Sequence, residues 1–312
     1  FIPLVLFLVL LLFVTSPFEM VEVVPRDGNG LNPMLQSLGM VVHPPILFMG
    51  FSGFLVPFAF AVVDLLERNT AARWLKRCRP WVLFSWTMLT AGIVTGGQWA
   101  YTELGWGGYW AWDPVENASL FPWLSSTALV HALMIPKRKR HTKLWTFILI
   151  VATFILTIFG TFLTRSGVLD SVHAFSSGVL GHIFLAVLGV ITVFSLYLGI
   201  SRRKLLQDEE NAEEFGVSDW LSKWTSIQAA NVLFLLILVG VFFGTMFPLL
   251  SRTFGGREII LDESFYHQIS IPLFLIALFI MGLSPLCDWQ ATQPKLLLRK
   301  LWIPCLAGII TA

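Results

Sequence analysis

Long apolar runs, separated by shorter polar segments, recur along the whole chain. The run from Val232 to Phe243 is apolar on every face of a helix, whereas a helix of a soluble domain would keep a polar stripe. Only 13% of the residues are charged. We therefore expect an all-α, polytopic membrane protein, because helices satisfy their own backbone polar groups in lipid.

The apolar runs predict about nine transmembrane helices in a single polytopic domain that covers residues 1–312. Both ends of the chain lie inside apolar runs, and no basic segment precedes the first run, which indicates a part of a longer protein rather than a signal peptide. The lengths suit a hydrocarbon core of ~30 Å. The predicted spans are residues 1–15, 43–65, 80–97, 116–136, 145–163, 179–200, 228–250, 268–286 and 301 onward.

Positive charge is distributed unequally between the two sides of this predicted topology. Loops 66–79, 137–144, 201–225 and 287–300 hold 17 of the 21 Lys and Arg residues, and these loops are therefore expected to be cytoplasmic. No nucleic-acid partner is expected.

The three cysteines are predicted in a cytoplasmic loop (Cys78), at a cytoplasmic helix edge (Cys287) and within a span (Cys305), and no CxxC motif is present. A thiol-redox role is therefore not indicated.

Five of the 13 Trp residues lie between residues 99 and 123, in a segment expected on the non-cytoplasmic side. Interfacial Trp residues commonly anchor membrane proteins, but such residues are scattered over all helix ends. These are clustered and interleaved with glycines, which favours an aromatic platform for a flat apolar ligand over residues 98–123. The candidate platform residues are Trp99, Trp106, Trp110 and Trp112.

Asp113, Pro114 and Glu116 have the pattern of a helix start, with Asp113 as N-cap and Glu116 completing a capping box. This pattern gives the carboxylates a structural role, and Asp113 is also a candidate ligand-binding residue together with the Trp residues of this segment. The N–H groups of such a helix start would also favour an anionic group of a ligand. Haem is flat and apolar and carries two carboxylates.

Haem iron is commonly held by axial histidines. His43 and His173 lie on the same predicted side as the Trp-rich segment and bracket it in sequence, which favours ligands over solvated or capping side chains.

His131 lies about 27 Å along the helix from Asp113, in the inner half of the bilayer. It is either a neutral His bonded to a neighbouring helix or a ligand of a buried b-type haem. His182 and His267 are alternative outer ligands, and His141 is expected to be solvated.

Residues 106–119 (WGGYWAWDPVENAS) resemble the tryptophan-rich signature of the WWD haem-handling family. Residues 31–45 and 165–175 resemble the flanking blocks of its CcmF and NrfE branch. The resemblance implies a haem lyase of the holocytochrome c synthase type, which acts within a complex in the bacterial inner membrane, with its haem site facing the periplasm. It implies a substrate haem at the Trp-rich segment with His43 and His173 as axial ligands, and a b-type haem in the membrane ligated by His131 and a residue outside this chain.

The same resemblance implies several partners: the haem chaperone CcmE, subunits of the CcmH and CcmI type, apocytochrome c and, as electron donor, quinol. Thioether bonds would form between haem vinyl groups and the cysteines of a CxxCH motif. The dedicated NrfE-type role stays open. A haem exporter is the rival from another class, although neither repeat symmetry nor mid-membrane charge is visible in the sequence. A structural scaffold without haem is the second rival.

Overall fold

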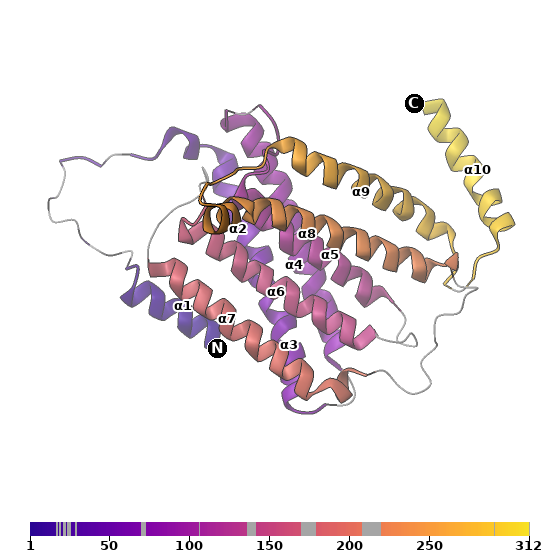
Figure 1. Cartoon of the computed structure of the whole chain (residues 1–312), viewed down its shortest axis with the longest axis horizontal. Helices are drawn as coiled ribbons and strands as arrows, with labels where there is room; N and C mark the ends of the chain where they lie inside the picture. Colours follow the sequence, from indigo (N-terminus) through magenta and orange to yellow (C-terminus); the bar gives the residue numbers. More distant parts are fainter. Residues whose placement is uncertain are drawn as a thin grey trace.

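The structure, a computed structural model, describes residues 1–16, 18, 20, 23, 26–28, 30–69, 73–105, 107–135, 142–169, 179–207, 220–289 and 291–311. In these ranges every regular element is a helix, which confirms the all-α prediction (Figure 1). The α-helices are α1 (Ile2–Phe13), α2 (Leu38–Gly53), α3 (Leu55–Leu66), α4 (Arg73–Glu103), α5 (Pro114–Met134), α6 (Thr142–Ser166), α7 (Val179–Ser201), α8 (Lys223–Gly255), α9 (Glu263–Leu283) and α10 (Pro294–Thr311). Short 3-10 helices are η1 (Pro33–Leu35), η2 (Arg203–Leu206) and η4 (Ser284–Leu286).

Five helical segments within the described ranges are long and apolar enough to cross a membrane. The expectation of nine spans is therefore corrected. Each of the five corresponds to a predicted span, and α2 and α3 together form one of them. The five segments are Leu38–Leu66, Lys143–Ser166, Leu180–Ser201, Lys223–Gly255 and Glu263–Leu286.

The other four predicted spans are helical but fall short for identifiable reasons. Helix α1 has 12 residues, which gives a length of about 18 Å at 1.5 Å per residue. The hydropathy of α4 is lowered by its basic first turn and by the Trp, Thr and Gly residues that follow, and that of α10 is lowered by its basic first segment. Helix α5 carries Glu, Asn, Ser, Thr and His residues, of which the Asn, Ser and Thr side chains are buried inside the bundle. Of the nine predicted spans, five therefore meet the length and composition of a membrane-crossing helix within the described residues.

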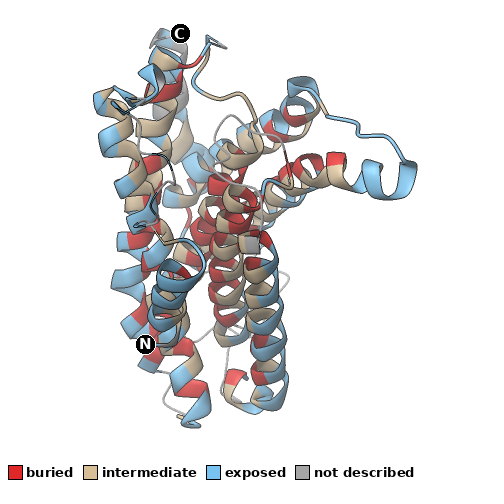
Figure 2. Ribbon diagram, turned by 90° about the vertical axis from the view of Figure 1, so that its left-hand side faces the viewer, coloured by how far each residue is buried: buried red, intermediate tan, exposed pale blue. Residues whose placement is uncertain are grey.

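Helix α5 is the central element of the bundle. It packs against α4, α6 and α8, and its residues from Asn117 to Leu129 are buried almost without interruption. Figure 2 shows that the buried positions gather in the interior helices, whereas α1 is largely exposed. A helix buried on all sides must satisfy its polar groups internally. Helix α5 therefore carries interhelical hydrogen bonds, such as that between Ser125 Oγ and Thr153 Oγ1 at 2.7 Å.

Helices α2 and α4 approach each other closely through glycines. A Cβ added at Gly50 would lie 2.6 Å from the backbone nitrogen of Leu89, and one added at Gly92 would lie 2.7 Å from Leu47 Cα. Small residues at such crossings let two membrane helices pack backbone to backbone. This contact fixes the position of α2, including His43, relative to the end of α4.

Candidate functional site

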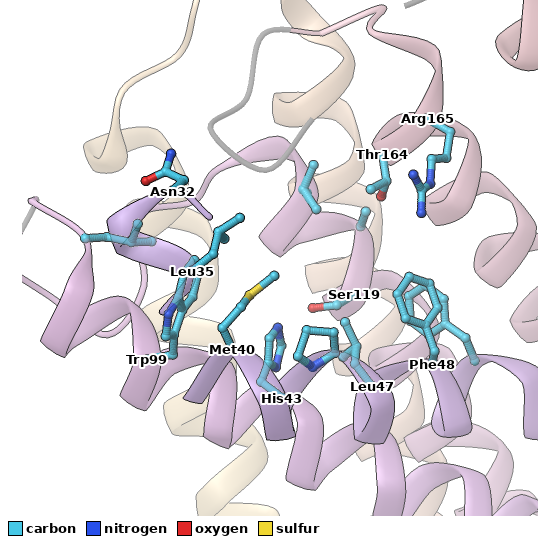
Figure 3. A pocket seen from close by; sticks show the side chains of 15 residues that line it. Asn32, Leu35, Met40, His43, Leu47, Phe48, Trp99, Ser119, Thr164 and Arg165 are labelled. Atoms are coloured by element: carbon cyan, nitrogen blue, oxygen red, sulfur yellow. The ribbon is translucent and has the colours of Figure 1, made fainter. Parts of the chain in front are cut away.

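A cavity of about 380 Å³ opens where α2, α4, α5 and α6 meet (Figure 3). Its volume is within the range of about 300–1,000 Å³ that is typical of small-molecule sites. The walls are mainly apolar and aromatic. The lining residues are Asn32, Leu35, Met40, His43, Pro44, Leu47, Phe48, Phe51, Trp99, Leu104, Val115, Ala118, Ser119, Thr164 and Arg165.

His43 lies on the cavity wall, and its ring is oriented by the backbone of α4. Its Nδ1 is 2.7 Å from the carbonyl oxygen of Gly92. A carbonyl only accepts hydrogen bonds, so Nδ1 carries the proton and Nε2 is the basic nitrogen. A backbone carbonyl on the second nitrogen is the usual arrangement for a metal-ligating histidine.

Two neighbours on α4 limit the movement of this ring. A Cβ at Gly96 would lie 2.5 Å from His43 Cε1, so the ring rests directly on a glycine. The Trp99 ring is nearly parallel to the imidazole, with 6.5 Å between centroids and 9° between planes. His43 therefore occupies one defined position beside an aromatic ring.

Arg165 is the only charged side chain among the described residues that line this cavity, apart from the titratable His43. It comes from the last turn of α6 and lies across the cavity from Trp99 (Figure 3). No role for Arg165 was predicted from the sequence. A signal was available, because Arg165 is one of only four basic residues on the predicted non-cytoplasmic side. A guanidinium in an apolar cavity can bind a carboxylate with two hydrogen bonds.

The Trp-rich segment leads into α5 through a strained turn. Trp112 has φ +58°, a left-handed conformation that bulky residues seldom adopt. Asn117 Nδ2 donates to the Trp112 carbonyl at 2.8 Å, and the indole stacks on Tyr266 with centroids 4.9 Å apart. These contacts hold the turn in place.

The predicted capping box is confirmed. Asp113 Oδ2 accepts from Val115 N at 3.0 Å, and Glu116 Oε2 accepts from the N–H groups of Ala111 and Asp113 at 2.9 and 3.2 Å. Both carboxylates therefore stabilise the start of α5 by occupying its N–H groups. The role of Asp113 as a haem contact stays a prediction.

The predicted platform residues fall into two groups. Trp99 and Trp110 share a smaller cavity with His43, of about 50 Å³, and Trp110 Nε1 is buried with no hydrogen-bond partner among the described residues. Trp112 instead lies at a separate cavity with Trp110 and His267, and its ring meets that of His267 edge to face at 5.9 Å. Trp106 and His173 lie outside the described residues.

His131 lies near the other end of α5, far from the cavity. Its Nδ1 is 2.9 Å from Asn231 Oδ1 on α8, and its ring centroid is 5.9 Å from that of Phe234. His131 was predicted from the sequence as a functional residue, whereas Asn231, which is 100 residues away in the chain, was not. His182 is exposed on α7. His141 is outside the described residues.

Cys78 and Cys287 are buried free thiols, and the side chain of Cys305 lies outside the described residues. Cys78 is in the basic first turns of α4, where its Sγ donates to the Pro57 carbonyl at 3.3 Å. Burial, with a smaller contribution from the Asp64 carboxylate, raises the pKa of the Cys78 thiol from 9.0 to about 12. The thiol is thus held in its neutral, unreactive form.

We expect Cys78 to resist alkylation by iodoacetamide at pH 8 in the folded protein. A pKa higher by three units lowers the thiolate fraction about 1,000-fold. Because the folded pKa lies above the unfolded one, this thiol should reduce stability only as the pH rises from about 9 towards 12. Mass spectrometry should find the residue modified only after denaturation. Equal rates of modification in folded and denatured protein would contradict the assignment.

Several known proteins are similar to this chain in sequence and in fold. A family model described as cytochrome C assembly protein matches residues 1–169. The chain is 40% identical to the cytochrome c-type biogenesis protein CcmF of Haemophilus influenzae, covering 92% of this chain and 44% of that protein. It is 39% identical to CcmF of Escherichia coli, covering 97% and 46%, and 38% identical to NrfE of Haemophilus influenzae, covering 95% and 46%.

A solved structure of a cytochrome c heme lyase CcmF is also similar, with a TM-score of 0.66 and 32% identity over 93% of this chain and 41% of that one. The chain thus spans less than half the length of these relatives. The family model nevertheless covers more than half of the chain, including the Trp-rich segment, His43 and Arg165. The chain therefore belongs to the cytochrome c assembly protein family.

Proposed function

We propose that the chain positions haem for covalent attachment to apocytochrome c on the periplasmic side of the bacterial inner membrane, as part of a CcmF-type haem lyase complex. The observation that carries the proposal is His43, which lies in an apolar cavity with Nδ1 held by the Gly92 carbonyl and with Arg165 lining the same cavity from α6. Periplasmic placement is supported by the basic loops at the opposite ends of the helices.

The residues of the cavity suit haem as a substrate. Apolar and aromatic walls match the macrocycle, and Nε2 of His43 is the basic nitrogen that would ligate iron, because Nδ1 carries the proton. Arg165 suits a propionate, and the buried, unpartnered Nε1 of Trp110 in the adjoining cavity is a second donor for an anionic or carbonyl oxygen. His173 is proposed as the second axial ligand.

In the proposed reaction, each thiol of an apocytochrome CxxCH motif adds across one haem vinyl group. A carbon–sulfur bond forms at one vinyl carbon, and the thiol proton passes to the other. No protein nucleophile is required. The chain would contribute orientation. Trp99 and His43 would hold the haem macrocycle and leave its vinyl edge open to the thiols. The reaction between two separate molecules would then take place between groups already held in position.

We further propose that His131 ligates a b-type haem within the membrane, with its second ligand outside this chain. When bound, this haem would supply electrons that keep the iron of the substrate haem reduced.

The proposed partners are CcmE as haem donor, CcmH- and CcmI-type subunits as apocytochrome carriers, and quinol as reductant. Identity to NrfE is 38% against 40% to CcmF, so a role dedicated to nitrite reductase is the alternative.

Reduced-minus-oxidised spectra of the purified protein would test both sites. His131→Ala is expected to remove the membrane haem signal and leave the outer site able to bind added haem. The double variant His43→Ala, His173→Ala should show the opposite pattern. If the haem content of both variants equals that of the wild type, the ligand assignments are wrong and a scaffold role is favoured.

A further inference from the structure

A buried polar pair joins α5 and α8 near the end of α5 that is remote from the Trp-rich segment. His131 Nδ1 lies 2.9 Å from Asn231 Oδ1, and Asn231 is only 1% exposed. The two helices pack side by side along the bundle. An asparagine buried among apolar helices costs free energy unless its amide is hydrogen-bonded, so its partners specify how it is oriented.

The second partner of the Asn231 amide determines which of its atoms faces His131. Asn231 Nδ2 donates to Gln228 Oε1, one turn earlier on α8, at 3.3 Å. The amide oxygen is therefore directed at the imidazole. Because this oxygen only accepts, His131 Nδ1 carries the proton and Nε2 is the basic nitrogen. Gln228, Asn231 and His131 form one directed chain of hydrogen bonds.

This arrangement repeats the one found at His43, with a side-chain amide in place of a backbone carbonyl. In both cases an oxygen acceptor holds Nδ1–H and makes Nε2 the basic nitrogen. Acceptors of this kind orient ligating histidines and raise their basicity. A bond that served only to join α5 and α8 would not require the partner to be a histidine with a defined tautomer.

We propose that Asn231 is the positioning residue for His131, fixing its tautomer and ring orientation for the membrane haem, with Gln228 holding the Asn231 amide in register. The inference rests on the proposed function of His131. Asn231 touches no reacting atom. It acts through the imidazole, and its removal changes the electron-donating strength of the ligand as well as its orientation.

The test uses the full-length protein and measures the haem content, the α-band and the midpoint potential of the membrane haem at pH 8. Asn231→Leu, which removes the acceptor, is expected to weaken haem retention about 10-fold or more and to raise the potential. Asn231→Asp keeps the shape and offers a stronger acceptor. It should retain haem and shift the potential downward, opposite to Asn231→Leu.

Thr153→Val is the matched control, because it removes the similarly buried bond between Ser125 and Thr153 on another face of α5. It should lower thermal stability to a similar degree without moving the potential. If Asn231→Leu fails to fold, Asn231→Asp and Gln228→Leu provide the same readout, with a smaller upward shift expected for Gln228→Leu.

Two results would separate the possible failures. If His131→Ala removes the haem but the Asn231 and Gln228 variants keep the wild-type potential and α-band, the positioning role is wrong and the proposed function stands. If His131→Ala leaves the membrane haem in place, the ligand assignment itself is wrong, and the inference about Asn231 is overturned with it.

Discussion

Replacing Gly96 by alanine is expected to reduce haem attachment to c-type cytochromes nearly as far as replacing His43 itself. The added Cβ would lie 2.5 Å from His43 Cε1 and 2.8 Å from Nδ1. Something must shift to make room, and displacing the ring from the Gly92 carbonyl breaks the 2.7 Å hydrogen bond and turns Nε2 away from its position. Losses of this kind at ligating histidines are about 10- to 100-fold.

Haem staining of periplasmic c-type cytochromes, in a strain whose only copy carries the substitution, measures this effect. Gly189→Ala is the matched control, since it makes the same change in α7, where a Cβ meets no atom within 4 Å. The control should give normal cytochromes at equal protein abundance. Normal yield with Gly96→Ala would mean that the position of the His43 ring does not matter for attachment.

Replacing Asn117 by alanine is expected to destabilise the protein by about 2–3 kcal/mol and to disorganise the start of α5. Asn117 is fully buried, and its Nδ2 donates both to the Trp112 carbonyl and to Thr245 Oγ1 at 3.0 Å. Without the first bond, the left-handed conformation of Trp112 loses its anchor. That conformation costs about 1–2 kcal/mol, which then favours a different turn.

Thermal unfolding in detergent, together with the fluorescence of the Trp-rich segment, measures this change. Thr245→Val removes the bond to α8 but leaves the contact between Asn117 and Trp112, so it should cost clearly less than Asn117→Ala. Equal losses in the two variants would show that the Trp112 anchor contributes nothing to stability.

Local features of the site were predictable from the sequence because they depend on neighbours in the chain. The capping box of Asp113 and Glu116 forms as expected, since its hydrogen bonds join residues at most five positions apart. The helical segments were also predictable from apolar runs. The number of spans was not, because the polar residues of α5 face other helices and lower its hydropathy without preventing its burial.

Contacts between distant segments were not predictable. The bond from His43 to Gly92 spans 49 positions and that from His131 to Asn231 spans 100. No pattern in one sequence indicates which glycine will receive a histidine ring or which asparagine will face another helix. The Trp residues were predicted to form one platform. In the structure, Trp99 instead lies beside His43, whereas Trp112 stacks on Tyr266 of α9.

The residues that form the walls of the cavity of about 380 Å³ lie far apart in the sequence, which has a consequence for biosynthesis. They begin with Asn32 and are completed only by Arg165 at the end of α6. A nascent chain that leaves the ribosome in sequence order therefore presents His43 and Trp99 well before the guanidinium that would engage a carboxylate. Partly inserted chains lack a complete cavity.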